Sequence, residues 1–381
     1  MNNVYFDNAA STPMDPEVFE HMKPYFCEHV GNPSSTHAHG RNLRNAIEQA
    51  RRTIAKHLNA TPQEFFFTSG GTEADNTAIL GAVKGYDLKH IITTPIEHHA
   101  VLHPVESLEK AGMKVTWLSV DSKGNIDLAE LREALANNSR SLVSIMHANN
   151  ELGTINDIHS IGELCKEFDA IFHSDTVQTM AHEKLDLQAI NVHFVTASAH
   201  KFYGPKGVGF LYVRKGIKIP ALIEGGSQEN NRRAGTENPA SIAGMAFSLD
   251  KCFANLEAKN EKLWALKNYM KAELETHFPG VTFNGEVAPG KSLPTVLNVS
   301  LPCGENDCML LFNLDLMGIS ASGGSACTSG ATVGSFVLKA IGASTGALKN
   351  SVRFSFGMQN TQEEVDFVIG KLKEIVSPQL A

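Results

Sequence analysis

Short apolar runs alternate with segments of helical spacing along much of the chain, and this alternation constrains the fold most. Apolar residues recur at helical spacing from Asn42 to Leu58, and a short aromatic strand from Glu64 to Thr68 follows. The pattern then predicts strands at 90–94, 114–119, 141–147 and 170–175 and helices at 100–111, 127–136 and 158–168. Such alternation predicts an α/β fold with a mainly parallel sheet and helices on both faces.

The pattern changes after a long helical zone from Pro239 to about Phe278. Strands are predicted at 295–301 and 351–356 and helices at 307–317 and 361–375, which indicates a smaller α+β domain. A chain of 381 residues also exceeds what one core usually fills. We therefore expect a large domain at 15–256 and a small C-terminal domain at 257–381, with residues 1–14 packing near the small one. No linker composition marks this boundary.

Charge and composition argue against several classes of protein. The net charge is −8 and the basic residues are scattered, which disfavours nucleic-acid binding. No apolar run approaches the roughly 18 residues of a membrane span, and no basic region precedes an apolar run at the N-terminus. Six cysteines are few for a disulfide scaffold of this length, which favours a reducing compartment. We expect a cytoplasmic protein that contacts neither membrane nor nucleic acid.

The stretch from Val195 to Gly209 places a lone lysine, Lys201, between a strand-like run and a tight turn. Lysine forms Schiff bases with carbonyl compounds when partial burial lowers its pKa. A surface lysine with a solvated amine is the alternative. The neighbouring Ser198 and His200 favour the reactive role.

The motif Ser198-x-His200-Lys201, followed by Tyr-Gly-Pro-Lys-Gly, resembles the pyridoxal phosphate (PLP) lysine motif of the class V aminotransferase superfamily. More closely, it resembles the cysteine desulfurases of the NifS and IscS kind. The resemblance extends over nearly the whole chain, from residues 5–12 through 31–35 to 351–355. It implies the aspartate aminotransferase-like fold of fold-type I PLP enzymes, with a large PLP-binding domain and a smaller C-terminal one.

A PLP site also needs an acid beside the pyridine nitrogen, and Asp175 ends an apolar strand. A carboxylate there favours the protonated ring, which withdraws electrons better. Gln178, three residues on, could donate to the ring oxygen. The alternative for Asp175 is a helix N-cap.

The S-G-G-T turn that ends at Thr72 offers backbone N–H groups at the start of a predicted helix, where an anion is favoured. No Walker lysine and no G-x-G-x-x-G accompanies it, so an ordinary capped helix is the alternative rather than a nucleotide loop. By resemblance, Gly71, Thr72, Ser198 and His200 hold the PLP phosphate. Thr236 matches a family threonine that reaches this phosphate from the other subunit, which implies a homodimer.

His98 follows a glutamate after a predicted strand. In the resembling family this histidine stacks on the pyridine ring and can move protons. A metal site is the competing interpretation, because His99 and His103 are spaced i, i+4. No third ligand is marked, so we expect no metal.

Asn150 and Arg353 are candidates for the substrate carboxylate, and the resemblance also places Asn150 at the cofactor. A guanidinium binds a carboxylate with two parallel hydrogen bonds, as an amino-acid substrate requires. Arg353 lies in an otherwise apolar strand, so a buried ion pair is the alternative.

Cys327 lies in a run of small residues with neither helical nor strand period, which is typical of an exposed loop. A thiol there can ionise and attack. The segment matches the cysteine loop of group I cysteine desulfurases, so the resemblance makes Cys327 the sulfur acceptor. Cys303 and Cys308 form a C-x4-C pair without a second pair, and we expect a turn with two incidental thiols.

The resemblance implies a PLP-dependent cysteine desulfurase that converts L-cysteine to alanine and leaves a persulfide on Cys327. In it, Lys201 or His98 moves the α-proton. The sulfur would pass to an acceptor protein for iron–sulfur clusters or another thio-cofactor. The short tail after residue 375 argues against delivery to a scaffold of the IscU kind. A selenocysteine lyase and an inactive sulfur-relay binding protein are the alternatives.

Overall fold

The structure, a computed structural model, describes residues 3–138, 140–303, 308–323 and 334–380. Its strands are β1 (Val4–Tyr5), β2 (Phe65–Thr68), β3 (His90–Thr93), β4 (Lys114–Trp117), β5 (Leu142–Ser144), β6 (Ile171–Asp175), β7 (Phe194–Ser198), β8 (Gly209–Val213), β9 (Thr282–Asn284), β10 (Val296–Ser300), β11 (Ile319–Ser320) and β12 (Ser351–Ser355). The α-helices are α1 (Pro16–Cys27), α2 (Ala38–His57), α3 (Gly71–Tyr86), α4 (His99–Lys110), α5 (Leu128–Ala136), α6 (Ile158–Glu167), α7 (Gln228–Asn231), α8 (Pro239–Ala254), α9 (Leu256–His277), α10 (Leu310–Leu316), α11 (Phe336–Ala340), α12 (Thr345–Lys349) and α13 (Gln362–Leu380). Short 3-10 helices are η1 (Pro62–Glu64) and η2 (Ala199–Lys201).

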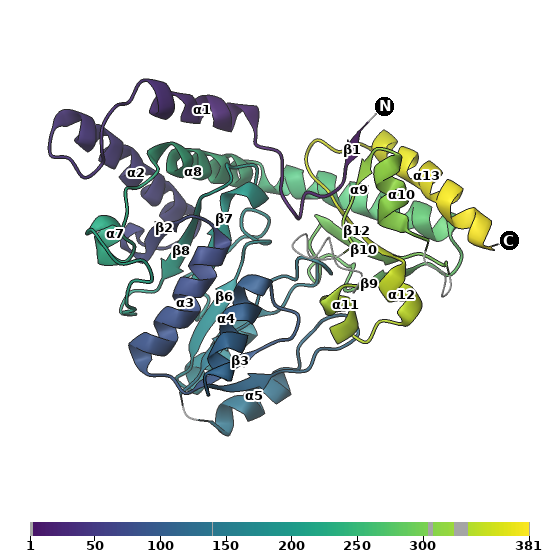
Figure 1. Cartoon of the computed structure of the whole chain (residues 1–381), viewed down its shortest axis with the longest axis horizontal. Coiled ribbons are helices and arrows are strands. Elements are labelled where there is room, and N and C mark those ends of the chain that lie inside the picture. Colours follow the sequence, from purple (N-terminus) through teal and green to yellow (C-terminus); the bar gives the residue numbers. More distant parts are fainter. Residues whose placement is uncertain (1–2, 139, 304–307, 324–333, 381) are drawn as a thin grey trace.

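The larger sheet has seven strands in the order β2-β8-β7-β6-β5-β3-β4 (Figure 1). Neighbours from β7 through β6, β5 and β3 to β4 are parallel, whereas β8 runs antiparallel to both β7 and β2. The α/β fold with a mainly parallel sheet that the sequence predicts is therefore confirmed.

Helices cover both faces of this sheet because successive strand residues point to opposite sides. In β2, Phe66 packs into the hydrophobic cluster that contains residues of α3 and α4. Its neighbours Phe65 and Phe67 pack into the cluster with residues of α2, α5, α6 and α8. A strand that is apolar throughout therefore contributes side chains to the hydrophobic clusters on both faces of the sheet.

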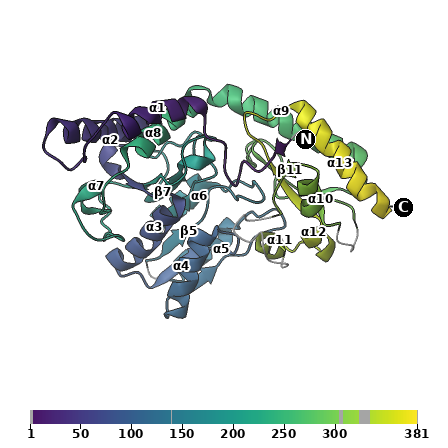
Figure 2. The same ribbon diagram turned by 45° about the horizontal axis from the view of Figure 1, so that its top comes forward.

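The C-terminal part contains the antiparallel sheet β12-β10-β9 (Figure 1), and its strand β11 pairs in parallel with β1 from the N-terminal segment. The helices α9 and α13 lie side by side along this part (Figure 2). Its hydrophobic core combines Val4 and Phe6 with residues between Leu263 and Val376. Cys252 at the end of α8 instead packs into the core of the larger sheet. Because the two hydrophobic cores divide between these residues, we propose that the domain boundary lies near Glu257, in the first turn of α9. We also propose that residues 1–14 pack near the small domain.

Cys303 and Cys308 depart from the expectation of two incidental thiols. Their sulfurs are 2.06 Å apart and form a disulfide, with the Cα atoms 6.3 Å apart. This Cα separation lies within the range that a disulfide can bridge. The expectation was wrong because sequence spacing alone does not show whether a turn brings two cysteine side chains close enough to bond.

No helix in the described part of the chain is long and apolar enough to cross a membrane.

Candidate active site

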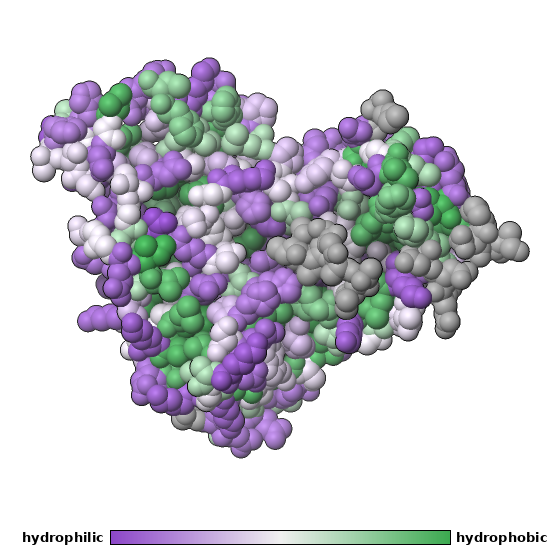
Figure 3. Space-filling view, viewed as in Figure 1, coloured by the Kyte–Doolittle hydropathy of each residue, from purple (hydrophilic) through white to green (hydrophobic). Residues whose placement is uncertain are grey.

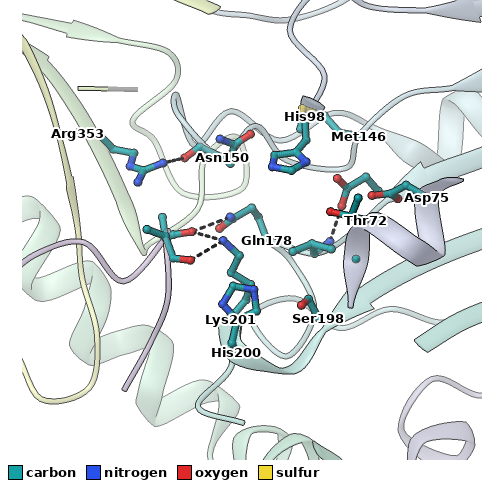
Figure 4. Close-up of a pocket in the computed structure, with 15 residues that line it drawn as sticks. Thr72, Asp75, His98, Met146, Asn150, Gln178, Ser198, His200, Lys201 and Arg353 are labelled. Carbon is teal, nitrogen blue, oxygen red and sulfur yellow. Dashed lines mark hydrogen bonds between the residues drawn. The ribbon is translucent and has the colours of Figure 1, made fainter. Parts of the chain in front are cut away.

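A cavity of about 250 Å³ opens at the carboxyl ends of β6 and β7, beside the N-terminus of α3 (Figure 4). Parallel α/β sheets commonly bind ligands at this edge. The lining residues are Ala9, Ala10, Gly71, Thr72, Asp75, His98, Met146, Asn150, Asp175, Val177, Gln178, Ser198, His200, Lys201 and Arg353. Residues from distant parts of the sequence, including the N-terminal segment and β12, therefore meet in one place.

Lys201 ends η2, immediately after β7, and its side chain reaches into this cavity. Its Nζ donates to the carbonyl oxygens of Ala9 at 2.6 Å and Ala10 at 2.9 Å. The Gln178 amide also donates to the Ala9 carbonyl, at 3.1 Å. The N-terminal segment thus holds the lysine amine at the cavity wall.

Asp175 ends β6 and is buried. Its Oδ1 accepts a hydrogen bond from the Val177 N–H at 2.8 Å. Burial, and next the nearby carboxyl of Asp75, raise the pKa of Asp175 to about 6. An ionised Asp175 therefore gains most from a cationic partner in the cavity, which a protonated pyridine ring provides.

The start of α3 forms an anion cradle at the other end of the cavity. Gly70 precedes the helix with φ of 152°, a conformation that L side chains rarely adopt, and a Cβ at Gly71 would lie 2.9 Å from Val177. Both positions therefore require glycine. The first N–H groups of α3 are left without helical carbonyl partners, and Thr72 and Ser198 line the same end of the cavity.

His200 lies beside this cradle and stays neutral. Burial, and next the charge of Lys201, lower the pKa of its imidazole to about 4. Its Nδ1 is 3.3 Å from the Ser11 hydroxyl. A neutral ring can therefore offer one N–H to a phosphate without adding charge.

His98 caps α4, and its Nδ1 accepts a hydrogen bond from the Ala100 N–H at 3.1 Å. The proton of the neutral ring is therefore on Nε2. Burial is the main cause that lowers the pKa of His98, and Asp175 partly opposes it. A neutral imidazole at the cavity wall can both stack on a ring and exchange a proton.

Arg353 lies in β12 and Asn150 follows β5, at the end of the cavity away from Thr72 and Ser198 (Figure 4). The Arg353 Nη1 donates to the Asn150 carbonyl at 2.8 Å. Its Nη2 donates to Asp7 Oδ1 at 2.7 Å. The ion pair that the sequence left as an alternative exists, and the guanidinium nevertheless lines the cavity.

Two expected site residues are not among the residues that line the cavity. Thr236 is exposed and does not line the cavity. Cys327 lies outside the described residues. Among the described residues, no group of three or more histidine, cysteine, aspartate or glutamate side chains could hold a metal ion.

Sequence reasoning missed Asp75, which lines the cavity from α3, four residues after Gly71. Its carboxylate is fully buried, and burial raises its pKa to about 7. Asp75 Oδ1 lies 3.3 Å from Nε2 of the buried His173. The i, i+4 spacing from the cradle glycine was the signal that could have found Asp75. No comparable signal marks the carbonyls of Ala9 and Ala10.

The residues present fit PLP. The anion cradle suits the phosphate, a buried carboxyl with raised pKa suits the pyridine nitrogen, and a lysine amine lies at the wall of the same cavity. These three features are distributed over one cavity in the arrangement that the cofactor needs.

Comparisons with known proteins agree with this geometry. Residues 4–368 match the family described as Aminotransferase class-V. The chain is 45% identical to "Cysteine desulfurase IscS" of Dictyoglomus turgidum, over 98% of this chain and 94% of the relative. It is 44% identical to "Putative cysteine desulfurase IscS 1" of Bacillus subtilis, over 99% of both chains.

Solved structures give the same result. A "NIFS-LIKE PROTEIN" aligns with a TM-score of 0.91 and 36% identity, over 99% of this chain and 100% of the other. "SspA in complex with cysteine" aligns with a TM-score of 0.83 and 34% identity, over 93% of this chain and 98% of the other. The family match extends along nearly the whole chain, and one cavity is lined by the lysine, the buried acid and the anion cradle. This protein therefore belongs to the class V aminotransferase family of PLP-dependent enzymes.

Proposed function

We propose that this protein is a PLP-dependent cysteine desulfurase that converts L-cysteine to L-alanine and carries the sulfur away as a persulfide. One observation carries the proposal: a single cavity is lined by Lys201, Asp175, His98, Arg353 and the start of α3. The relatives named cysteine desulfurase and the related structure in complex with cysteine support this substrate.

The predicted site residues have different roles in binding. Gly71, Thr72, Ser198 and His200 hold the phosphate, and Asp175 pairs with the pyridine nitrogen, with Gln178 near the ring oxygen. Arg353 and Asn150 bind the α-carboxylate at the far end. When bound, PLP supplies an aldehyde that takes the substrate amine and a ring that withdraws electrons from the bonds at Cα.

Proton transfer falls to the groups that flank the substrate. Lys201 Nζ, which donates to the Ala9 and Ala10 carbonyls, would be the group that takes the α-proton of the bound substrate. His98 is neutral and can exchange a proton at Nε2. The pair therefore provides both a base and an acid.

Sulfur transfer is assigned to Cys327. Its thiolate attacks the substrate sulfur, the Cβ–S bond breaks, and the electron pair stays with the carbon skeleton. Protonation of that carbon gives alanine, and the sulfur remains on Cys327 as a persulfide. An acceptor protein, for iron–sulfur clusters or another thio-cofactor, then takes this sulfur.

The test compares the wild-type holoenzyme with Lys201→Ala and Cys327→Ala. The wild type should form alanine from L-cysteine and a persulfide on Cys327, measured by amino-acid analysis and mass spectrometry. Lys201→Ala should lose both the PLP absorption band that borohydride collapses and the turnover, because no other amine lines the described cavity. Cys327→Ala should keep the band and L-cysteine binding yet release almost no alanine.

Selenocysteine separates the remaining alternatives. A desulfurase whose Cys327 accepts the sulfur should lose activity with cysteine in Cys327→Ala and retain some with selenocysteine, because selenium leaves more readily. Undiminished alanine release from cysteine in Cys327→Ala would make this cysteine a bystander. A wild type without any turnover would indicate a binding protein instead.

We also propose that the active enzyme is a homodimer in which Thr236 completes the phosphate site of the partner. Thr236 is exposed and does not line the cavity of its own chain, which supports a role in trans. Hydrophobic atoms gather on the surface over α1 (Figure 3), where Phe19 and Phe26 are exposed, and Leu222 and Ile223 are exposed before Thr236. Such patches are common at subunit interfaces.

A further inference from the structure

The arginine assigned to the substrate carboxylate already has a carboxylate partner in the protein. Arg353 Nη2 donates to Asp7 Oδ1 at 2.7 Å, and the side chains of Arg353 and Asp7 are 2% and 18% exposed. A buried guanidinium needs such a countercharge. Asp7 does not line the cavity, whereas Arg353 does, so Asp7 contacts the guanidinium from outside the substrate space.

Asp7 is held at this position by two further contacts. The Ser322 hydroxyl donates to the same Oδ1 at 2.8 Å. The backbone of Asp7 forms a parallel bridge with Ser355, at the end of the strand that carries Arg353. These contacts hold the Asp7 carboxylate against Arg353.

The guanidinium has hydrogen-bonding capacity left for a second anion. Nη1 donates to the Asn150 carbonyl and Nη2 to Asp7, while the buried Nε has no hydrogen-bond partner among the residues that the structure describes. A guanidinium group has five N–H donors, so Arg353 has donors left for a carboxylate that enters the cavity. The charge of Arg353 is, however, already neutralised by Asp7 when this carboxylate binds.

We propose that Asp7 sets how tightly the site holds α-carboxylates, because it shares Arg353 with the substrate and the product. The inference rests on the proposed role of Arg353 in substrate binding. Two carboxylates that share one guanidinium repel each other, so Asp7 weakens the binding of amino acids and favours release of alanine.

The experiment measures binding of L-alanine to the PLP-loaded protein by titration calorimetry and by the change in PLP absorption. Asp7→Asn removes the charge, while its amide oxygen can still accept from Arg353 and Ser322. It should bind L-alanine about tenfold more tightly, because nearby like charges repel strongly in a poorly solvated site. L-alaninamide lacks the carboxylate, so its affinity should not change.

Ser322→Ala is the matched control, since it removes a hydrogen bond to the same oxygen and keeps the charge. Its affinity for L-alanine should stay within about twofold of wild type, as expected when no charge is lost. Asp7→Ser provides a second uncharged variant should Asp7→Asn not fold, and it should also bind L-alanine more tightly. Unchanged affinity in the uncharged variants would show that Asp7 has no influence, and weaker affinity would show that it only orients Arg353; either result overturns the inference.

The two proposals fail separately. A wild type that desulfurates L-cysteine and an uncharged Asp7 variant with unaltered alanine affinity would leave the proposed function standing and remove this inference alone. A wild type that does not turn over L-cysteine would remove the proposed function.

Discussion

Asp175 and Asp75 place two buried carboxyl groups on one cavity, and Asp75 disfavours ionisation of Asp175. Burial is the larger cause for both, and Coulomb repulsion by Asp75 adds to the raised pKa of Asp175. Asp75 further lies against the neutral His173, whose pKa burial lowers to about 4. A protonated pyridine ring beside Asp175 would favour the ionised form of this carboxyl, which burial and Asp75 disfavour.

Asp175→Asn should leave PLP bound but slow turnover of L-cysteine. The amide carries no charge to favour the protonated ring, and a loss of roughly 3 kcal/mol of transition-state stabilisation means about a hundredfold in rate. Steady-state alanine release measures the effect. Asp186→Asn, at an exposed position that does not line the cavity, is the control. A rate within twofold of wild type would remove Asp175 from the pyridine nitrogen.

Glu97→Gln tests a third buried carboxyl, which lies next to His98 in the sequence. Glu97 accepts from the Thr94 hydroxyl at 2.8 Å and from the Met146 N–H at 3.1 Å, and burial raises its pKa to about 8. Since this folded-state pKa lies above the unfolded one, the contribution to stability is complete at low pH and is lost as the pH rises through about 8.

The free energy of unfolding of wild type should therefore fall more between pH 6 and pH 9 than that of Glu97→Gln. The slopes of unfolding free energy against pH should differ by at most about 1.4 kcal/mol per pH unit, which is the slope that one bound proton gives. Urea denaturation across this range measures it. Equal slopes in the two proteins would mean that Glu97 is ionised in the fold.

At the scale of elements, a buried ion pair ties α2 to the segment that leads to Thr236. Arg51 of α2 binds Glu229 through two hydrogen bonds, at 2.7 and 3.0 Å, and also donates to the Phe65 carbonyl of β2. Glu229 in turn accepts from the Phe67 N–H. The pair therefore joins a helix, the edge strand of the large sheet and a segment expected at the subunit interface.

Arg51→Ala should lower the free energy of unfolding by about 3–5 kcal/mol, because it leaves Glu229 buried without its cation. Arg52→Ala is the matched control, since Arg52 is the exposed neighbour on the same helix. It should change stability by less than about 0.5 kcal/mol. Equal small effects in both variants would show that water or another group compensates Glu229.

At the scale of the whole molecule, the location of Thr236 leads to a complementation experiment. Lys201→Ala and Thr236→Ala should each impair PLP binding when expressed alone. In a mixed dimer, one site would combine an intact Lys201 from the Thr236→Ala chain with an intact Thr236 from the Lys201→Ala chain. Coexpression should therefore restore one normal site per mixed dimer, measured as PLP content and alanine release after tandem purification. No restoration would place Thr236 in its own site or outside any site.

Sequence reasoning located most of the cavity because its main residues follow strands. Lys201, Asp175 and the glycines before α3 lie at strand ends, and the topology of a parallel sheet brings the carboxyl ends of strands to one edge. The periodic pattern likewise predicted β2, β3, β4, β5 and β6 of the large sheet, and all of these except β4 are buried along their whole length.

Side-chain partners across the fold did not follow from the sequence. The pairing of Arg353 with Asp7, the joining of Cys303 to Cys308 and the approach of Asp75 to His173 each depend on how distant elements pack. The sequence alone determined the family, the sheet and the chemical groups of the cavity, since these follow from local periodicity and motif order. Only the tertiary structure decided which charges share a partner, because burial and distances of a few ångströms between remote segments set those energies.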